Sequence, residues 1–139
     1  MSARQSFRIK ADLDELRQVA AAAEELGLQE DLSPALVHQV DLAIEEIGNN
    51  VIRHGFEGGP GEIEITLTSE SDTITIEIAD DGRAFNPLKD APIPDVEAAL
   101  EDRPIGGLGV HLVLTMMDEM HYKRKNGRNH LTLVKRRTE

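Results

Sequence analysis

Hydrophobic and polar residues alternate strictly in two neighbouring stretches of the chain, Glu62 to Thr68 and Thr73 to Asp80. Both stretches are rich in isoleucine and threonine, which favour β-strands, and a polar turn at residues 69–72 separates them. Alternation with a period of two places every second side chain on the same face of a strand. The pattern therefore predicts a β-hairpin with one apolar face.

Apolar residues recur at helical spacing in two segments closer to the N-terminus. The first begins at about Leu13 and is predicted to end at Gly27, because glycine commonly terminates helices. The second begins at Ser33-Pro34, an N-cap residue followed by proline at the first helical position, and is predicted to run to about His54. An apolar stripe predicts that one face of this second helix packs on a sheet. The stripe consists of Val40, Ala43, Ile44, Ile47 and Val51.

The remaining segments predict three more strands and one more helix. Short alternating runs at residues 6–10, 120–125 and 129–135 predict the strands. A helix is predicted to begin at the glycines of residues 106–109, after an irregular, proline-rich segment from 82 to 105. Together these elements predict an α/β two-layer sandwich, with helices on one face of a mostly antiparallel sheet.

The composition is that of a single domain without cysteine. The 139 residues are 40% hydrophobic but only 3% aromatic, so we expect a core of aliphatic side chains. The absence of cysteine excludes disulfides, thiolate zinc sites and a cysteine nucleophile. No apolar run reaches the ~20 residues that span a bilayer. The first residues contain no hydrophobic stretch typical of a secretion signal, so we expect a cytoplasmic protein that does not contact membranes.

The net charge of −11 narrows the expected ligands and partners. A negative field of this size repels nucleic acid, so we expect no nucleic-acid partner. It also repels ATP, which means that a nucleotide site would need local compensation from a cation and backbone N–H groups. Seven of the 15 Lys and Arg residues lie between Lys123 and Arg137. This basic stretch is interpreted either as a solvated pair of strands or as a docking edge for an acidic partner.

Polar side chains on the second predicted helix lie at the border of its apolar stripe. Glu46 and Asn50 are one turn apart, and Arg53 or His54 continues their line. The carboxamide oxygen of Asn50 suits magnesium, which prefers oxygen ligands. The Glu46 carboxylate could accept a proton from a hydroxyl or a water that attacks a phosphate. The alternative interpretation is an ordinary amphipathic helix with a solvated edge.

Asp80 follows a row of three isoleucines, at positions 74, 76 and 78, and is predicted to point into the same buried face. A buried carboxylate is costly unless it is hydrogen-bonded, and an adenine amino group is one candidate partner. Gly82 would allow the backbone to approach a flat ligand closely. The alternative is a strand that ends in an ordinary Asp-Gly turn.

The last predicted helix opens with Gly106-Gly107-Leu108-Gly109. Bare N–H groups and the helix dipole make such a helix start attractive to phosphate, which supplies the local compensation that an acidic chain needs. A flexible glycine hinge is the alternative. The order of elements does not fit a Rossmann unit, and no Gly-Lys-Ser/Thr of a P-loop is present.

In this order and on these elements, the three segments resemble the motifs of the gyrase, histidine-kinase and MutL (GHKL) ATPase superfamily, which has the Bergerat fold. The matching motifs are Glu46-x-x-x-Asn50, Asp80-x-Gly82 and Gly107-Leu108-Gly109. Within this superfamily, residues 45–56 and 117–119 are most similar to the bacterial anti-sigma-factor serine kinases. The resemblance extends from about Phe7 to Lys135. It implies one ATPase domain, residues 1–139, with an ATP lid at about 83–106 and a mixed, mostly antiparallel sheet.

The resemblance also implies a role for each motif. Asn50 would bind Mg²⁺, Glu46 would be the catalytic base, and Asp80 would accept a hydrogen from the adenine amino group. The glycines that open the last helix would surround the phosphates of ATP. The residues implied in nucleotide binding are Asn50, His54, Asp80, Gly82, Ala84, Gly106, Gly107, Leu108, Gly109 and Val110.

Two positions depart from the family pattern. Ala84 stands where many relatives have glycine, at the start of the lid. Asn129 or His130 stands where many relatives have a threonine near the adenine, and Thr132 lies close by in the sequence. The chain also lacks a long helical hairpin that could present a phospho-accepting histidine, which argues against a sensor histidine kinase.

The resemblance implies an ATP- and Mg²⁺-dependent serine/threonine protein kinase that acts as an anti-sigma factor. It would phosphorylate a small anti-sigma-factor antagonist and sequester a sigma factor, and a homodimer is also implied. The alternative is a non-catalytic ATP-binding regulatory module that acts by protein contact alone. A plain ATPase ranks last, because such enzymes move further domains and 139 residues leave none.

Overall fold

Five strands form one sheet in the computed structural model, which describes residues 3–57, 59–90 and 107–137. The strand order is β1-β2-β3-β5-β4, and every pairing between the described strands is antiparallel. The strands are β1 (Ala3–Lys10), β2 (Glu62–Ser69), β3 (Thr73–Asp80), β4 (Glu119–Lys125) and β5 (Arg128–Arg136). The predicted hairpin of β2 and β3 is confirmed, and β3 lies at the centre of the sheet.

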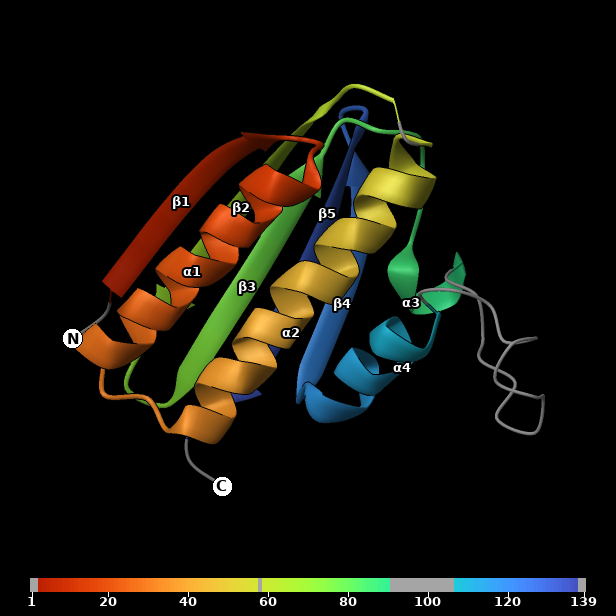
Figure 1. Cartoon of the computed structure of the whole chain (residues 1–139). Helices are drawn as coiled ribbons and strands as arrows, with labels where there is room; N and C mark the ends of the chain where they lie inside the picture. Colours follow the sequence, from red (N-terminus) through yellow and green to blue (C-terminus); the bar gives the residue numbers. More distant parts are fainter. Residues whose placement is uncertain (1–2, 58, 91–106, 138–139) are drawn as a thin grey trace, which may run out of the picture.

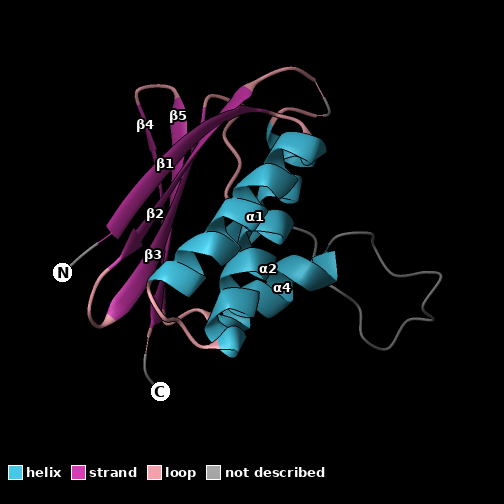
Figure 2. Ribbon diagram, turned by 60° about the vertical axis from the view of Figure 1, so that its left-hand side comes forward, coloured by secondary structure: helices cyan, strands magenta, loops and turns pink. Residues whose placement is uncertain are grey.

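The long helices cover one face of this sheet (Figures 1 and 2). The helices are α1 (Leu13–Gln29), α2 (Pro34–Asn50), the π-helix η1 (Val51–Gly55), α3 (Pro87–Asp90) and α4 (Gly107–Met116). Helix α2 occupies the middle of the layer, with α1 on one side and α4 on the other. The predicted α/β two-layer sandwich is confirmed. In the part of the chain described, no helix is long and apolar enough to cross a membrane.

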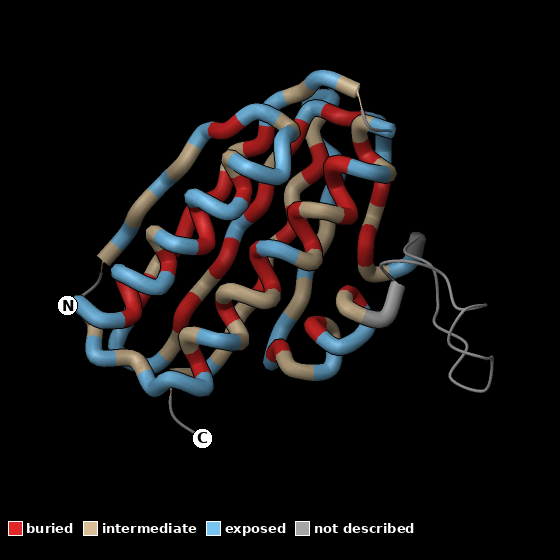
Figure 3. Tube along the Cα trace, viewed as in Figure 1, coloured by how far each residue is buried: buried red, intermediate tan, exposed pale blue. Residues whose placement is uncertain are grey.

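Aliphatic side chains fill the space between the two layers, as the low aromatic content predicts. The isoleucine row of β3 and the apolar stripe of α2 face one another, and Ile44 and Ile47 are completely buried. Figure 3 shows this segregation, with buried positions toward the sheet and exposed positions on the outer side of the helices. Burial of this stripe fixes the rotation of α2 and thereby aims the polar residues beside it.

Helix α1 extends past the predicted end, which is a correction to the sequence analysis. Gly27 lies inside the helix and is buried, and the helix continues to Gln29. A Cβ atom at Gly27 would lie 2.5 Å from Cγ2 of Val37 on α2. Glycine is therefore needed here for the close approach of two helices and not to terminate one.

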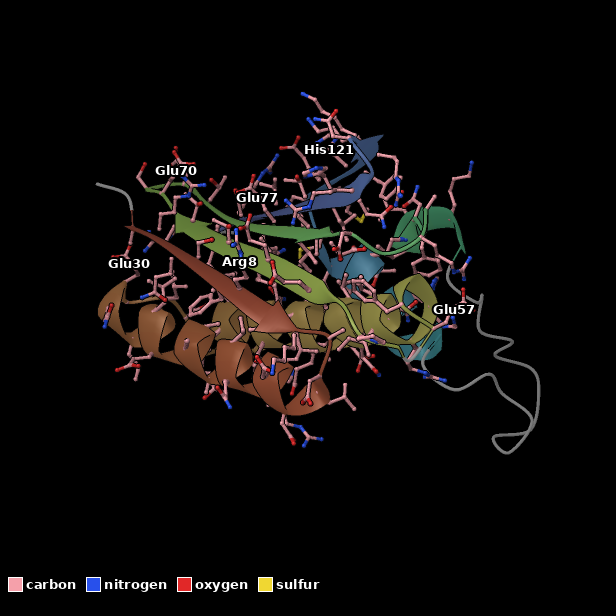
Figure 4. The ribbon with its side chains drawn as sticks, turned by 90° about the horizontal axis from the view of Figure 1, so that it is seen from above. Arg8, Glu30, Glu57, Glu70, Glu77 and His121 are labelled. Carbon is pink, nitrogen blue, oxygen red and sulfur yellow. The ribbon has the colours of Figure 1, made fainter. Side chains whose placement is uncertain are left out.

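The opposite face of the sheet carries polar and charged side chains. Glu77 and His121 extend from this face, away from the helices (Figure 4). Arg8 forms salt bridges there with Glu62 and Glu64 at 3.4 and 3.3 Å. No described helix covers this face.

Three of the basic residues between 123 and 137 make internal contacts, while Lys123 and Lys125 are exposed. Arg124 donates to the carbonyl of Gly82 at 2.8 Å. Lys135 pairs with Asp118 at 3.7 Å. Arg137 joins the β2–β3 turn to the end of α1 by donating to the carbonyls of Glu70 and Glu30, each at 2.7 Å.

Candidate functional site

The three sequence motifs meet at the C-terminal end of α2. Helix α4 begins beside this end, and β3 finishes beneath it. The contact is closest between Gly109 and Glu46, because a Cβ atom at Gly109 would overlap the Glu46 carboxylate. The start of α4 can therefore lie against α2 only because position 109 has no side chain.

Glu46 is half-buried on the side of α2 that faces α4. Burial raises the pKa of its carboxyl group above the usual value, and the neighbouring charge of Glu45 adds to this effect. Glu46 also lines a cavity of about 230 Å³ between α1 and α2, together with Leu13, Arg17 and other residues. A carboxylate with a raised pKa at the edge of a cavity can exchange a proton with a group that enters it.

Asn50 is the last residue of α2 and is only 3% exposed. Its Oδ1 atom is buried and has no hydrogen-bond partner in the described structure. The π-helix η1 begins at the next residue, and π-helical turns often occur at functional sites. An unpartnered buried oxygen is costly unless a ligand satisfies it, and an amide oxygen is an appropriate ligand for Mg²⁺.

The described residues contain no group of three or more His, Cys, Asp or Glu side chains that could hold a metal ion. A magnesium ion at Asn50 would therefore take its other ligands from outside the protein. This arrangement is typical of Mg²⁺ bound together with a nucleotide, where phosphate oxygens and waters complete the octahedron. The residues present fit such an ion.

Asp80 ends β3 and is 2% exposed, so it faces the helices as its register with the isoleucines predicts. Its Oδ1 accepts hydrogen bonds from the Gly82 N–H and from Nδ2 of Asn129, both at 2.9 Å. Burial raises the pKa of Asp80, and these two hydrogen bonds oppose the rise. Both donors bind the same oxygen, which leaves Oδ2 as the acceptor for a ligand.

Gly82 brings the loop after β3 against the end of η1. A Cβ atom at Gly82 would lie 2.7 Å from the carbonyl oxygen of Gly55, and the Arg83 N–H donates to that same oxygen at 3.0 Å. The Gly82 carbonyl accepts from Arg124 of β4. The loop is thus held between η1 and β4. A residue larger than glycine at position 82 would not fit this close to the Gly55 carbonyl.

Asn129 is the residue of β5 that lies opposite Asp80, whereas His130 lies opposite Ala79. Of these two residues, Asn129 is therefore the one that contacts Asp80. It is 3% exposed, and its Nδ2 donates to Asp80 Oδ1 and, at 2.8 Å, to the carbonyl of Arg83. Its Oδ1 accepts from the Phe85 N–H at 3.3 Å and from the Tyr122 hydroxyl. Both amide hydrogens are in use, so Asn129 holds Asp80 and the next loop in place and has no donor left for a ligand.

His54 and Ala84 lie at the rim of this arrangement. The His54 ring stacks on the buried Phe85 ring, with centroids 5.3 Å apart, and its backbone carbonyl accepts from Arg83 Nε at 2.6 Å. Burial lowers the pKa of His54, and the charges of Arg53 and Arg83 lower it further. Ala84 is exposed. Phe85 was not among the predicted site residues. The one feature of the sequence that distinguishes it is that it is the single aromatic residue of the proline-rich segment 82–105.

The residues at the start of α4 are described in part. Gly107, Leu108 and Gly109 form its first turn, and Val110 is 1% exposed and packs in the core. A contact from Val110 to a phosphate would therefore come from its backbone. Gly106 and the lid residues 91–106 lie outside the described part of the chain.

The chain is similar to known proteins over most of its length. The chain matches the histidine kinase-like ATPase domain over residues 9–135. It is 33% identical over 133 residues to the serine/threonine-protein kinase BtrW of Bordetella bronchiseptica, covering 90% of this chain and 93% of that protein. It is 32% identical over 94 residues to the serine-protein kinase RsbW of Bacillus mycoides, covering 66% of this chain and 59% of that one.

A solved structure supports the fold. The crystal structure of the RsbU and RsbW domains of Rv1364c from Mycobacterium tuberculosis superimposes with a TM-score of 0.63. The match covers 96% of this chain and 32% of that one at 15% sequence identity, a level at which only the fold is shown.

Proposed function

Because the chain belongs to the family of histidine kinase-like ATPase domains, we propose that it is an ATP- and Mg²⁺-dependent serine/threonine protein kinase. The observation that carries the proposal is the unpartnered buried oxygen of Asn50, one helical turn from the half-buried Glu46. An arrangement that only stabilised the fold would not leave that oxygen unsatisfied. The kinase names of the relatives BtrW and RsbW support the same reaction class.

The nucleotide would lie between α2, α4 and the end of β3, within one domain that spans residues 1–139. Oδ2 of Asp80 would accept a hydrogen from the adenine amino group, since Oδ1 is already occupied. Gly82 would form the adjoining wall. The N–H groups at the glycine-rich start of α4, residues 106–109, would receive the phosphates, with His54, Ala84 and Val110 around them. The segment from about 83 to 106 would be the lid.

Asn50 would hold the magnesium ion through its Oδ1 atom. The ion supplies charge neutralisation for the transferred phosphoryl group when it is bound. Asn50 itself brings no net charge to the site, so the ion's positive charge stays available to the phosphates. This matters in a protein whose net charge is −11.

Glu46 would accept the proton of a serine or threonine hydroxyl on the substrate protein. The hydroxyl oxygen forms a bond to the γ-phosphorus, the bond to the leaving ADP breaks, and the proton passes to Glu46. Its raised pKa makes it a better proton acceptor than an exposed glutamate.

The substrate would be a small anti-sigma-factor antagonist, and the second partner a sigma factor. A phosphate adds about −1.5 to −2 charges to the antagonist, which favours its release from this acidic protein. The freed kinase would then sequester the sigma factor in the cytoplasm, as a monomer or as a homodimer. The alternative remains a regulatory module that binds ATP and acts by contact alone.

Isothermal titration calorimetry with ATP, with and without Mg²⁺, tests the site. We expect the wild type to bind, Asp80→Asn to lose adenine recognition, and Asn50→Ala to lose the dependence on magnesium. Asp81→Asn, a change at an exposed neighbour, is the matched control and should bind as the wild type does. No binding of millimolar ATP by the wild type would refute the proposal. Binding without transfer to a purified antagonist would favour the regulatory module.

A further inference from the structure

A groove lies between the C-terminal half of α1 and the N-terminal half of α2, away from Asn50 at the last position of α2. Its volume is about 380 Å³, and we call it the α1–α2 groove. The residues that line it are Glu24, Gly27, Leu28, Leu32, Pro34, Val37, His38 and Asp41. Asp41 and Asn50 are nine residues apart, about 13 Å along the helix axis at 1.5 Å per residue.

Most of the groove surface is apolar, and one of the residues that line it has a large, exposed apolar side chain. Leu28 is 84% exposed, compared with 45% for Leu13 and 48% for Leu112, the other exposed large hydrophobic residues in the described chain. A single exposed leucine is common on protein surfaces, but one beside an apolar concavity adds to a patch that a partner can cover. The floor is closely packed, because Gly27 lies directly against Val37 there.

The wall formed by Asp41 lacks a counter-ion. Oδ1 of Asp41 is buried and has no hydrogen-bond partner in the described structure. Asp41 shares a hydrogen bond with Glu24 of α1, and Glu45 lies one turn further along α2. His38 is the one neighbour that favours the charged form of Asp41. At neutral pH two carboxyl groups therefore share a site that holds too few donors.

Burial raises the pKa of Asp41 to about 6, and the hydrogen bond with Glu24 and the charges of Glu45 and Glu24 contribute to the rise. A cation bound in the groove beside Asp41 and Glu24 would offset the repulsion between the two carboxyl groups. A charge-assisted hydrogen bond of this kind is about twice as strong as a neutral one. The groove thus combines an apolar surface with one position for a positive charge.

We propose that the α1–α2 groove is a docking site for a segment of a partner protein that presents an aliphatic side chain beside a lysine or arginine. The aliphatic group would cover the floor and Leu28, and the cation would reach Asp41 and Glu24. Charge complementarity selects this occupant, because Asp41 and Glu24 both line the groove, so an acidic segment would add to their repulsion and a neutral segment would leave it uncompensated. The groove lies apart from the proposed nucleotide site, so this inference does not depend on the proposed kinase activity.

A titration followed by ¹⁵N–¹H NMR of the whole chain tests the chemistry of the groove. The smallest probe is isoamylamine, with isoamyl alcohol and isovalerate as neutral and anionic controls of the same shape. The second probe is a short helical peptide with one leucine and one lysine a turn apart, and its control has glutamine in place of lysine. We expect the amine and the lysine peptide to shift the amide signals of Leu28, Val37 and Asp41, with the peptide binding at least tenfold more tightly.

Variants separate the apolar and the charged parts of the site. Asp41→Asn should weaken binding of the lysine peptide at least tenfold, and Leu28→Ser should weaken it severalfold. Glu25→Gln, an exposed change on α1 outside the groove, is the matched control and should leave the affinity unchanged. Lowering the pH from 7.5 to 5 should weaken binding about tenfold as Asp41 takes up a proton. His38→Gln should retain most of this effect, which excludes a response from the imidazole alone.

Two results would overturn the proposal. Binding of the amine without the peptide would make the groove a small-amine site. Equal binding of the lysine and glutamine peptides would show that charge does not select the occupant. If the same preparation does not bind ATP, the proposed kinase function is wrong but the groove proposal is unaffected. The two proposals can therefore fail independently.

Discussion

Helix α2 meets different surroundings near its middle and at its C-terminal end, and each place has one buried polar atom without a hydrogen-bond partner in the described structure. In the described structure the buried side-chain atoms without a partner are Asp41 Oδ1 and Asn50 Oδ1. Asn50 lies near α4 and the end of β3, and Asp41 lies against α1. The core stripe of α2, which includes the fully buried Ile44 and Ile47, runs between them.

The chemistry of the two oxygens differs in a way that suits two ligands. Asn50 offers a neutral amide oxygen, which can coordinate a cation that is itself held by phosphates. Asp41 offers a carboxylate beside a second carboxylate, which needs a donor with a positive charge of its own. Each unpartnered oxygen lowers the free energy of unfolding. Burial of the apolar stripe of α2 offsets this loss.

The largest expected effect is on catalysis at the Asn50 end. Glu46→Gln should lower the rate of phosphoryl transfer to an antagonist protein by about 10²- to 10⁴-fold, because the proton acceptor is removed. ATP affinity should change little, since the shape of the side chain is kept. Single-turnover transfer from radiolabelled ATP, together with calorimetric ATP binding, measures both quantities. Transfer at the wild-type rate would mean that Glu46 is not the base.

The second effect concerns the hydrogen bonds that hold Asp80. Asn129→Ala should lower the free energy of unfolding by about 3 kcal/mol, because the Arg83 carbonyl and the Phe85 N–H both lose their partner in a buried site. Loss of the Asn129 donor should also raise the pKa of Asp80 further. Binding of an adenine nucleotide should weaken as the pH falls and Asp80 takes up a proton, and in the variant this weakening should begin at a higher pH than in the wild type.

Urea denaturation and the pH profile of ADP binding test this prediction. Tyr122→Phe is the comparison variant, because it removes one hydrogen bond to Asn129 and should cost only about 1 kcal/mol. Equal costs for the two variants would argue against the central role of Asn129.

The third prediction compares Gly82, which packs against η1, with Gly27, which packs against α2. Gly82→Ala should lower the free energy of unfolding by roughly 2 kcal/mol, because its Cβ meets a backbone carbonyl that cannot move aside. Gly27→Ala should cost less, roughly 1 kcal/mol, because its Cβ meets a side-chain methyl of Val37 that can shift. Thermal or urea denaturation of both variants gives the comparison, and the reverse order would contradict it.

The smallest expected effect is a gain in stability when the charge of Asp41 is removed. The pKa of Asp41 is about 6 in the folded protein, whereas the ordinary value of an aspartate is 3.8, so the folded state binds more protons than the unfolded state between these limits. Wild-type stability should therefore rise as the pH falls from about 6 toward 4. Asp41→Asn should stabilise the protein at pH 7.5 by at most about 1 kcal/mol, since solvent screening reduces the effect of a partly exposed group.

Urea denaturation of the wild type and Asp41→Asn at pH 7.5 and 4 measures this difference. The gain should shrink toward zero at the lower pH, where the wild-type carboxyl is protonated as well. A gain that does not change with pH would indicate a packing effect in place of the proposed electrostatic one.

Local patterns in the sequence predicted most of the helices and strands and the orientation of the residues near Asn50. Period-two alternation predicted the β2–β3 hairpin and the burial of Asp80, since the direction of a side chain on a strand follows from its register. The spacing of Glu46 and Asn50 predicted that both lie on one side of α2, because residues four apart are neighbours on a helix. These predictions needed only the geometry of a single element.

Contacts between elements decided the rest. The sequence alone determined an aliphatic two-layer sandwich and a nucleotide-site hypothesis at the C-terminal end of α2. Only the packing of α1 on α2 made Gly27 an interior residue and brought Glu24 to Asp41. Only the pairing of β5 with β3 selected Asn129 over His130 as the partner of Asp80. The physical reason is that periodicity fixes the direction of a side chain, whereas its neighbours on other elements depend on how the elements pack.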